Sequence, residues 1–301
     1  MNNANVCVIM SSYNGENFLD EQIDSIINQK NVNVTLLIRD DDSSDTTKDI
    51  LKKWSERPNI LVYLEDNIGV GKSFMRTLSY SKKFDFYAFS DQDDVWKSNK
   101  LELAVKKMKE YDLKKPILYY SNYELVDVNK NKLIRRSESK FVNYESAFFQ
   151  SRAIGCSMVF NHEAKLLMEK FKLPKNSIHD YWMYRVVYSM GEVVFDKTKT
   201  FYYRQHANNV IGENNNIFSY WINRFNRIKN IKVSKIDEAG IIYNMLEKHI
   251  IDTSKKDGLK KIALSKKNFK YKLELIKSKN VYGQTKIDTI LLKIAFALNK
   301  L

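Results

Sequence analysis

The stretch FYAFSDQDDVW, residues 86–96, decides the fold, because an apolar run ends in three carboxylates within four positions. Phe86–Phe89 has the composition of a short buried strand. Carboxylates as close in sequence as Asp91, Asp93 and Asp94 are expected to repel one another. A divalent metal ion, a nearby Lys or Arg, or solvent must relieve this repulsion. We therefore expect the strand to end at a charged site.

Strand-like and helical segments alternate before this stretch. The earlier apolar runs, at Val6–Met10, Val34–Ile38 and Ile60–Leu64, are each followed by a helical pattern. This order predicts an α/β fold with a mostly parallel sheet and right-handed crossovers. Ligands of such sheets bind beyond the carboxyl ends of the strands. Polar loops fall at those ends, at Ser11–Gly15, Arg39–Asp45 and Ser90–Asp94.

The second part of the chain is mixed. A helix opens at Ile178 and stops at Gly191, and we place a domain boundary near residue 213. Residues 1–212 form the expected catalytic domain, with one half at about 1–115 and the other at about 116–212. Four further strands are expected, at Ile117–Tyr120, Glu124–Val128, Val193–Phe195 and Thr200–Tyr203.

Positive charge is concentrated in residues 213–301, which hold 19 Lys and Arg against 8 Asp and Glu in a chain of net charge +14. This basic helical region predicts an anionic partner, either a membrane surface or a nucleic acid. Trp221, Phe225, Ile228 and Ile231 recur at helical spacing among Arg and Lys, as in helices that lie on anionic membranes. A basic face packed on the catalytic domain is the open alternative. Nucleic-acid binding is less favoured, because no basic-aromatic recognition motif is visible.

The expected compartment is cytoplasmic. Cys7 and Cys156 lie in apolar surroundings, which favours buried, reduced thiols. No run of 18 apolar residues occurs, and the first residues do not resemble a signal peptide. We therefore expect a cytoplasmic protein that is at most peripheral on the inner face of the plasma membrane.

The pair Asp91 and Asp93 suggests a site for Mn²⁺ or Mg²⁺, because hard divalent ions prefer oxygen ligands. Such an ion would also hold a diphosphate. A solvated acidic turn is the alternative for so short a motif. Metal-dependent nucleotidyltransferases also use paired carboxylates, so this enzyme class stays open beside a sugar transferase.

Several motifs together resemble family 2 glycosyltransferases with the GT-A fold. The order and spacing match over about the first 100 residues, and two later motifs resemble bacterial rhamnosyltransferase-type members. The motifs are VIMSSYN at 8–14, IRDDDSSD at 38–45, DNIG at 66–69, SDQDDVW at 90–96, HDYW at 179–182 and YRQHANNVIG at 203–212. The resemblance implies inverting transfer from a nucleotide diphosphate sugar, dTDP-rhamnose or a UDP-sugar. The implied acceptor is a hydroxyl of a polysaccharide or lipid-linked saccharide. This reaction needs a metal at the diphosphate, a base at the acceptor and a nucleotide pocket.

The resemblance assigns roles to single residues. Asp180 is the implied base, and an ordinary helix cap is the alternative role for this residue. Asp93 and His206 are the implied metal ligands, and a structural role is the alternative for His206. Trp96 and Trp182 would flank the sugar, although Trp is more often a core residue. The residues implied in nucleotide binding are Ser11, Tyr13, Asp41, Gly71, Lys72 and Asp91.

One position departs from the family pattern. Asp42 stands where the family usually has Gly, which raises the question of whether this loop keeps its backbone angle. Asp tolerates left-handed geometry better than most residues.

Overall fold

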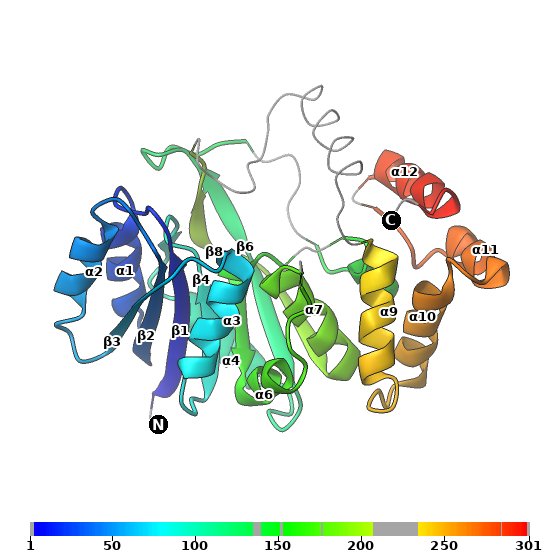
Figure 1. Ribbon diagram of the computed structural model, residues 1–301, viewed down its shortest axis with the longest axis horizontal. Coiled ribbons are helices and arrows are strands. Elements are labelled where there is room, and N and C mark those ends of the chain that lie inside the picture. The colour runs from blue at the N-terminus through cyan, green and yellow to red at the C-terminus, as the bar shows by residue number, and fades with distance from the viewer. Residues whose placement is uncertain are drawn as a thin grey trace.

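The computed structural model describes residues 3–134, 140–150, 153–175, 177–206, 234–283 and 285–299. The predicted basic amphipathic helix around residues 221–231 and the predicted boundary near 213 lie outside these ranges. Figure 1 shows a central sheet with helices on both faces and further helices at one end.

A sheet of eight strands forms the centre of the fold, in the order β3-β2-β1-β4-β7-β6-β8-β5. Strands β1 to β4 pair in parallel, β7 is antiparallel to both its neighbours, and β6 is parallel to β8. The strands are β1 (Ala4–Ser12), β2 (Val32–Asp41), β3 (Ile60–Glu65), β4 (Phe86–Ser90), β5 (Val95–Trp96), β6 (Ile117–Val126), β7 (Met158–Asn161) and β8 (Glu192–Arg204).

The first four strands confirm the predicted parallel order. β1 lies between β2 and β4, so the strand order reverses there, which is where open α/β sheets bind ligands. Val6 and Val8 face one side of the sheet, whereas Cys7 and Ile9 face the other, and all four are fully buried. Burial on both faces explains the nearly continuous apolar run of this strand.

Helices cover both faces of the sheet, as Figure 1 shows. The apolar sides of α1 (Leu19–Ile27), α2 (Thr47–Trp54) and α4 (Lys100–Met108) join one core cluster. The other cluster includes α3 (Val70–Tyr80), α5 (Tyr144–Ala147), α6 (His162–Lys170) and α7 (His179–Met190). The helix predicted to end at Gly191 therefore exists, with Gly191 directly after its last residue.

Two predicted strand pairs are wrong in detail. The runs at Ile117–Tyr120 and Glu124–Val128 form the single strand β6, and the runs at Val193–Phe195 and Thr200–Tyr203 form the single strand β8. The polar residues between the runs stay in the sheet because β6 and β8 pair across them with register shifts around Asn122. Backbone pairing with a long neighbour outweighs the local loss of apolar pattern.

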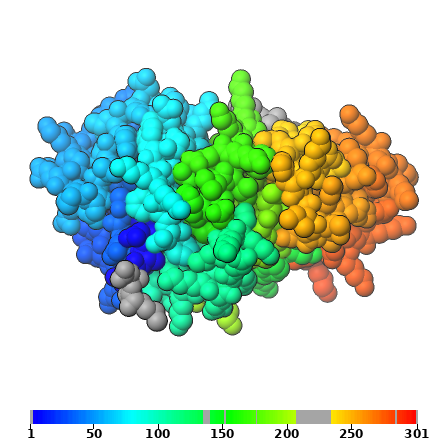
Figure 2. All heavy atoms as spheres, turned by 90° about the horizontal axis from the view of Figure 1, so that it is seen from below, coloured from blue at the N-terminus to red at the C-terminus, as the bar shows by residue number. Residues whose placement is uncertain are grey.

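Four helices complete the described C-terminal part: α9 (Lys235–Leu246), α10 (Thr253–Leu264), α11 (Phe269–Lys277) and α12 (Lys286–Ala297). Ile242 and Leu259 share a core cluster with Phe148 and Trp182, so these helices pack directly on the catalytic part. In Figure 2 the yellow segment lies directly beside the green segment, and the orange segment follows beyond the yellow one.

Both cysteines are buried and form no disulfide, in agreement with the expectation of buried thiols. Within the described ranges, no helix combines the length and the apolar character that crossing a bilayer requires.

Asp42 adopts a left-handed backbone with φ of 66°, so the loop after β2 keeps the geometry for which Gly is usual. Its carboxylate accepts a hydrogen bond from Lys48 at 2.9 Å, and both side chains are exposed. The conformation thus survives the departure from the family pattern because Asp tolerates it.

This loop gives a test of backbone strain. Asp42→Ala should lower the free energy of unfolding by about 1–2 kcal/mol, because an ordinary side chain is disfavoured in left-handed geometry. The matched Asp42→Gly variant should stay within about 1 kcal/mol of the wild type, because Gly accepts this φ. Urea denaturation measures both. Equal stability of the two variants would contradict the account.

Candidate functional site

Loops at the carboxyl ends of β1 and β4 are joined by one side chain. The Gln92 amide accepts a hydrogen bond from the Tyr13 backbone N–H at 2.8 Å and donates one to the Tyr13 carbonyl at 2.9 Å. From α1, Gln22 donates to the Ser90 hydroxyl at 2.7 Å. The acidic loop, defined as Asp91–Asp94, is therefore fixed against the polar loop that follows β1.

Asp93 and His206 lie in direct contact. The Asp93 Oδ2 and His206 Nε2 atoms are 2.8 Å apart, although 113 residues separate them in the sequence. The His206 ring also stacks on Phe18, with ring centroids 4.8 Å apart. Neighbouring ligands of an octahedral ion lie about 3 Å apart, so both atoms fit one Mn²⁺ or Mg²⁺ ion. The structure thus brings together the two residues predicted as metal ligands.

Arg204 anchors the acidic loop through hydrogen bonds and an ion pair. Its Nε donates to the Asp93 carbonyl at 3.0 Å, and one terminal nitrogen donates to the Val128 carbonyl at 2.8 Å. The other terminal nitrogen forms an ion pair with Glu21. The guanidinium also lies over the Phe18 ring, 4.8 Å from its centroid. One buried cation therefore ties the acidic loop to β8, α1 and the turn after β6.

Asp91 and Asp94, the other two carboxylates of the acidic loop, lie near the Cys156 thiol. Ligand atoms of these three residues lie within 4.8 Å of one another. Burial and the neighbouring Asp93 carboxylate raise the pKa of Asp91 to about 7. Burial also raises the pKa values of Asp94 and Cys156, and among the described residues Asp94 Oδ2 has no hydrogen-bond partner. Negative charge in this cluster is therefore costly unless a cation is close.

Lys100 places a cation beside this cluster. Its side chain is fully buried, and its Nζ donates to the Cys156 carbonyl at 3.0 Å. The ammonium lies 4.8 Å from the Trp96 ring centroid and 4.5 Å from that of Phe201. Burial lowers the pKa of Lys100 to about 8, whereas the nearby Asp94 carboxylate opposes this shift.

Asp180 lies in the first turn of α7 and is 8% exposed. Burial raises the pKa of this carboxyl group to about 6, although the backbone N–H groups of Tyr181 and Gly155 favour the charged form. Asp180 is also close enough to Asp91 to raise the pKa of that group. The predicted base and the acidic loop therefore share one electrostatic environment.

His179, the residue before Asp180, is buried in an aromatic environment. Its ring stacks on Phe74 at 4.0 Å and meets Phe89 edge-on at 4.9 Å. Burial lowers its pKa to about 3, so the imidazole is neutral at ordinary pH. Neutral His179 therefore places no positive charge beside the Asp180 carboxylate.

Asp41, one of the predicted nucleotide-binding residues, accepts hydrogen bonds from nearby backbone donors. Its Oδ1 accepts from the Ile68 N–H at 2.9 Å and its Oδ2 from the Gly69 N–H at 2.9 Å. The buried Arg39 guanidinium pairs with the same carboxylate. Because a carboxylate oxygen can accept two hydrogen bonds, the Oδ2 atom retains capacity for one more donor.

The other predicted nucleotide-binding residues surround the start of α3. The Ser11 hydroxyl donates to Ser73 at 2.6 Å, and Lys72 is exposed in the first turn of this helix. A Cβ atom on Gly71 would lie 3.3 Å from the Ser177 carbonyl and 3.7 Å from the His179 nitrogen. The start of α3 therefore lies between Asp41 and the segment that carries Asp180. Tyr13 is 51% exposed beside the acidic loop.

The two tryptophans predicted to contact the sugar are packed in the core. Trp182 is fully buried, and its indole nitrogen donates to the Phe171 carbonyl at 2.9 Å. Trp96 is 3% exposed and is covered by Lys100. In this arrangement neither ring presents a face to a ligand, so we assign both to packing and not to the site.

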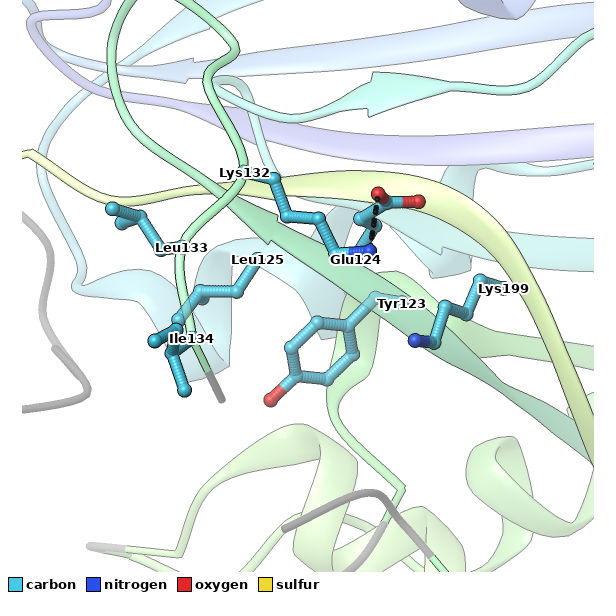
Figure 3. A pocket seen from close by; sticks show the side chains of 7 residues that line it. All are labelled: Tyr123, Glu124, Leu125, Lys132, Leu133, Ile134 and Lys199. Carbon is cyan, nitrogen blue, oxygen red and sulfur yellow. Dashed lines mark ion pairs between the residues drawn. The ribbon is translucent and has the colours of Figure 1, made fainter. Parts of the chain in front are cut away.

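A cavity of about 370 Å³ lies beside the strands that carry the site. Figure 3 shows Leu133 and Ile134 opposite Tyr123 and Lys199. Tyr123 packs against Tyr203 in a tilted arrangement with ring centroids 5.0 Å apart, and Tyr203 precedes Arg204 in β8. Tyr203 thus connects Tyr123, which lines the cavity, to Arg204, which anchors the acidic loop. Its lining is Tyr123, Glu124, Leu125, Lys132, Leu133, Ile134 and Lys199.

Sequence reasoning missed four residues that organise the site: Gln92, Lys100, Arg39 and Arg204. Gln92 and Arg39 lie inside motifs that were read only for their carboxylates, and Arg204 lies two residues before His206. A charged or amide side chain inside an otherwise recognised motif was the available signal. Lys100 gave no such signal, because its position in the sequence of α4 is that of an ordinary helix residue.

Comparison with known proteins identifies the family. The model of glycosyl transferase family 2 matches residues 7–173, which is more than half of the chain. The chain therefore belongs to this family and is a glycosyltransferase that transfers a sugar from a nucleotide sugar. This result decides against the nucleotidyltransferase and nucleic-acid-binding alternatives as the main activity.

Two curated relatives agree with this assignment. The dTDP-rhamnosyl transferase RfbG of Shigella flexneri is 30% identical over 226 residues, covering 68% of this chain and 74% of that protein. The Escherichia coli protein WfgD, a UDP-Glc:alpha-D-GlcNAc-diphosphoundecaprenol beta-1,3-glucosyltransferase, is 31% identical over 180 residues, covering 60% and 68%.

Solved structures share the fold. TarS 1–349 of S. aureus in complex with UDP superimposes with a TM-score of 0.58 at 15% identity, over 98% of this chain and 92% of that chain. The mannosyltransferase PcManGT from Pyrobaculum calidifontis, in complex with GDP-Man and Mn²⁺, gives a TM-score of 0.53 at 14% identity, over 99% and 87%. The predicted GT-A fold is thus confirmed.

The contacts of Arg204 give a test of how the site is held together. Arg204→Met should lower the free energy of unfolding by about 3 kcal/mol, because buried carbonyl groups lose their charged donor. The matched Arg57→Met variant removes an exposed guanidinium and should change stability by no more than about 0.5 kcal/mol. Urea denaturation measures both. A loss below about 1 kcal/mol for Arg204→Met would contradict the proposed anchoring role.

Proposed function

We propose that this chain is an inverting, metal-assisted glycosyltransferase that extends a cell-surface polysaccharide or a lipid-linked saccharide, with Asp180 as the base. The contact of 2.8 Å between Asp93 and His206 carries the proposal, because it gathers the two predicted metal ligands from separate strand ends. The proximity of Asp180 to Asp91 supports a single site.

Asp93 and His206 would hold Mn²⁺ or Mg²⁺, with Asp91 close by toward the ribose or the metal. When bound, the ion would neutralise charge on the leaving diphosphate. The donor set suits a manganese ion, since it combines carboxylate oxygen and imidazole nitrogen. Arg204 would keep this ligand pair together by fixing the Asp93 backbone.

Asp180 would take the proton of the acceptor hydroxyl at its carboxylate. A pKa of about 6 leaves this group ionised near neutral pH, yet more basic than an exposed carboxylate. Its place at the start of α7, fixed by the Tyr181 N–H at 2.7 Å, would orient the carboxylate toward the acceptor. Inversion follows if acceptor and diphosphate lie on opposite sides of the sugar carbon.

Asp41 would accept a hydrogen bond from the base of the nucleotide through the remaining capacity of Oδ2. Ser11 and Tyr13 would lie along the base and ribose, and Gly71 and Lys72 would lie at the start of α3 near the base edge or a phosphate. The similarity to a dTDP-rhamnosyl transferase supports dTDP-rhamnose as a donor, and the UDP-Glc-dependent relative supports a UDP-sugar.

The acceptor would approach from the side of the cavity lined by Tyr123 and Lys199. An aromatic ring together with Lys and Glu side chains suits a hydroxyl-rich ligand that carries negative charge. A relative that acts on a diphosphoundecaprenol-linked sugar supports a lipid-linked acceptor and peripheral attachment to the inner face of the plasma membrane.

Replacing the proposed base tests the mechanism. Asp180→Asn should lower kcat about 10²–10⁴-fold while KM for the donor stays within about threefold, because only proton removal is lost. With the wild type, each transfer should release a nucleoside diphosphate from dTDP-rhamnose or a UDP-sugar. The wild-type rate should also fall about tenfold per pH unit below pH 6, since protonation removes the base.

The matched control is Glu163→Gln, which alters a carboxylate in the first turn of another helix, α6. This variant should keep the wild-type kcat and pH profile. A normal rate for Asp180→Asn would show that another group is the base. Release of pyrophosphate in place of a nucleoside diphosphate would contradict the proposed reaction.

A further inference from the structure

Helix α12 is apolar on two sides, and the residues that the structure describes cover only one of them. On the inner side Leu292 and Phe296 are buried, and the Phe296 ring packs edge-on against Phe149 at 5.3 Å. A helix on a protein surface normally carries one apolar stripe, which faces the core. Helix α12 carries a second apolar face, which the described residues leave largely exposed.

The outer side consists of Ile287, Ile290, Ile294 and Leu298, called here the α12 stripe. Their side chains are 59%, 58%, 49% and 62% exposed. Their spacing of three and four residues places them on one face of the helix. Phe269 of the adjoining α11 is 71% exposed and adds a further exposed ring in the neighbouring helix. Contiguous exposed apolar surface of this kind marks an interaction site.

The surroundings of the α12 stripe are strongly basic. Residues 265–299 contain eight Lys and only two acidic residues, Glu274 and Asp288. Both acids are engaged within the fold, since Glu274 pairs with Lys261 at 3.1 Å and Asp288 caps the start of α12. With eight Lys against two acidic residues, the segment that carries the stripe has an excess of six positive charges.

We propose that the α12 stripe docks on an anionic lipid bilayer, with its aliphatic side chains in the interface and the surrounding Lys at the headgroups. Aliphatic residues beside Lys are typical of helices that lie on membranes. Protein interfaces, in contrast, are depleted in Lys and enriched in Tyr, Trp and Arg. A second copy of the chain would bring two positive surfaces together, which like-charge repulsion disfavours.

This docking would serve the proposed transfer to a lipid-linked acceptor, and to that extent it rests on the proposed function. Figure 1 shows α12 near the edge of the molecule toward which β1 and β6 run from their starts. The site loops follow the strand ends at that edge. Contact through α12 would therefore bring the site near the bilayer surface without a helix that crosses it.

Vesicle binding tests the inference with the full chain. Wild-type protein should co-sediment with phosphatidylcholine vesicles containing a quarter phosphatidylglycerol at least tenfold better than with pure phosphatidylcholine. The double variant Ile290→Glu/Ile294→Glu should lose about tenfold or more of this binding, because it places charge where apolar burial is required. Raising the salt concentration should also weaken wild-type binding.

Leu166→Glu is the matched control, because Leu166 is a 41% exposed apolar residue on a different helix, α6. It should bind vesicles like the wild type. Binding of UDP with Mn²⁺, measured by calorimetry without vesicles, should be unchanged in every variant, which separates docking from the proposed chemistry. Equal vesicle binding by the double variant would overturn the inference. The inference would also be overturned if the wild type formed a dimer that does not bind vesicles and the double variant were a monomer. A second copy of the chain would then cover the stripe.

Discussion

The buried Arg204 guanidinium is the contact on which the arrangement of the site depends. It donates to the Asp93 carbonyl and to the Val128 carbonyl and pairs with Glu21, so it links segments up to 183 residues apart. The position of His206, two residues further along, follows from this anchoring. A flexible cation could not serve, because only a planar guanidinium offers donors in several fixed directions.

Charge balance explains much of the remaining structure. Three carboxylates follow β4, and burial makes ionisation of two of them, Asp91 and Asp94, costly. Lys100 and Arg204 lie close to them and offset part of that cost, whereas Asp93 and His206 lie within hydrogen-bond distance of each other at 2.8 Å, a separation that a shared ion could also occupy. The same principle applies at Asp41, where Arg39 and two backbone N–H groups stabilise a buried carboxylate. Fixed positive groups thus allow acidic side chains to gather at the site proposed for the nucleotide and the metal.

Local pattern predicted the parallel half of the sheet and the residues at its carboxyl edge, because strand period and chain order are both visible in the sequence. It failed where pairing is not local, since β6 and β8 each continue through residues that look like loops. Arg204, Gln92 and Lys100 were missed for the same reason: their partners lie 56 to 183 residues away. The exposed side of α12 was also missed, because sequence periodicity does not distinguish a covered apolar face from an open one.

The account rests on one metal ion shared by Asp93 and His206 at the diphosphate. Crystals grown with UDP and Mn²⁺, examined by anomalous scattering at the manganese edge, test this most directly. The account predicts one manganese peak within coordination distance of Asp93 Oδ2, His206 Nε2 and the diphosphate. A peak among Asp91, Asp94 and Cys156, or a bound diphosphate with no manganese beside it, would contradict it.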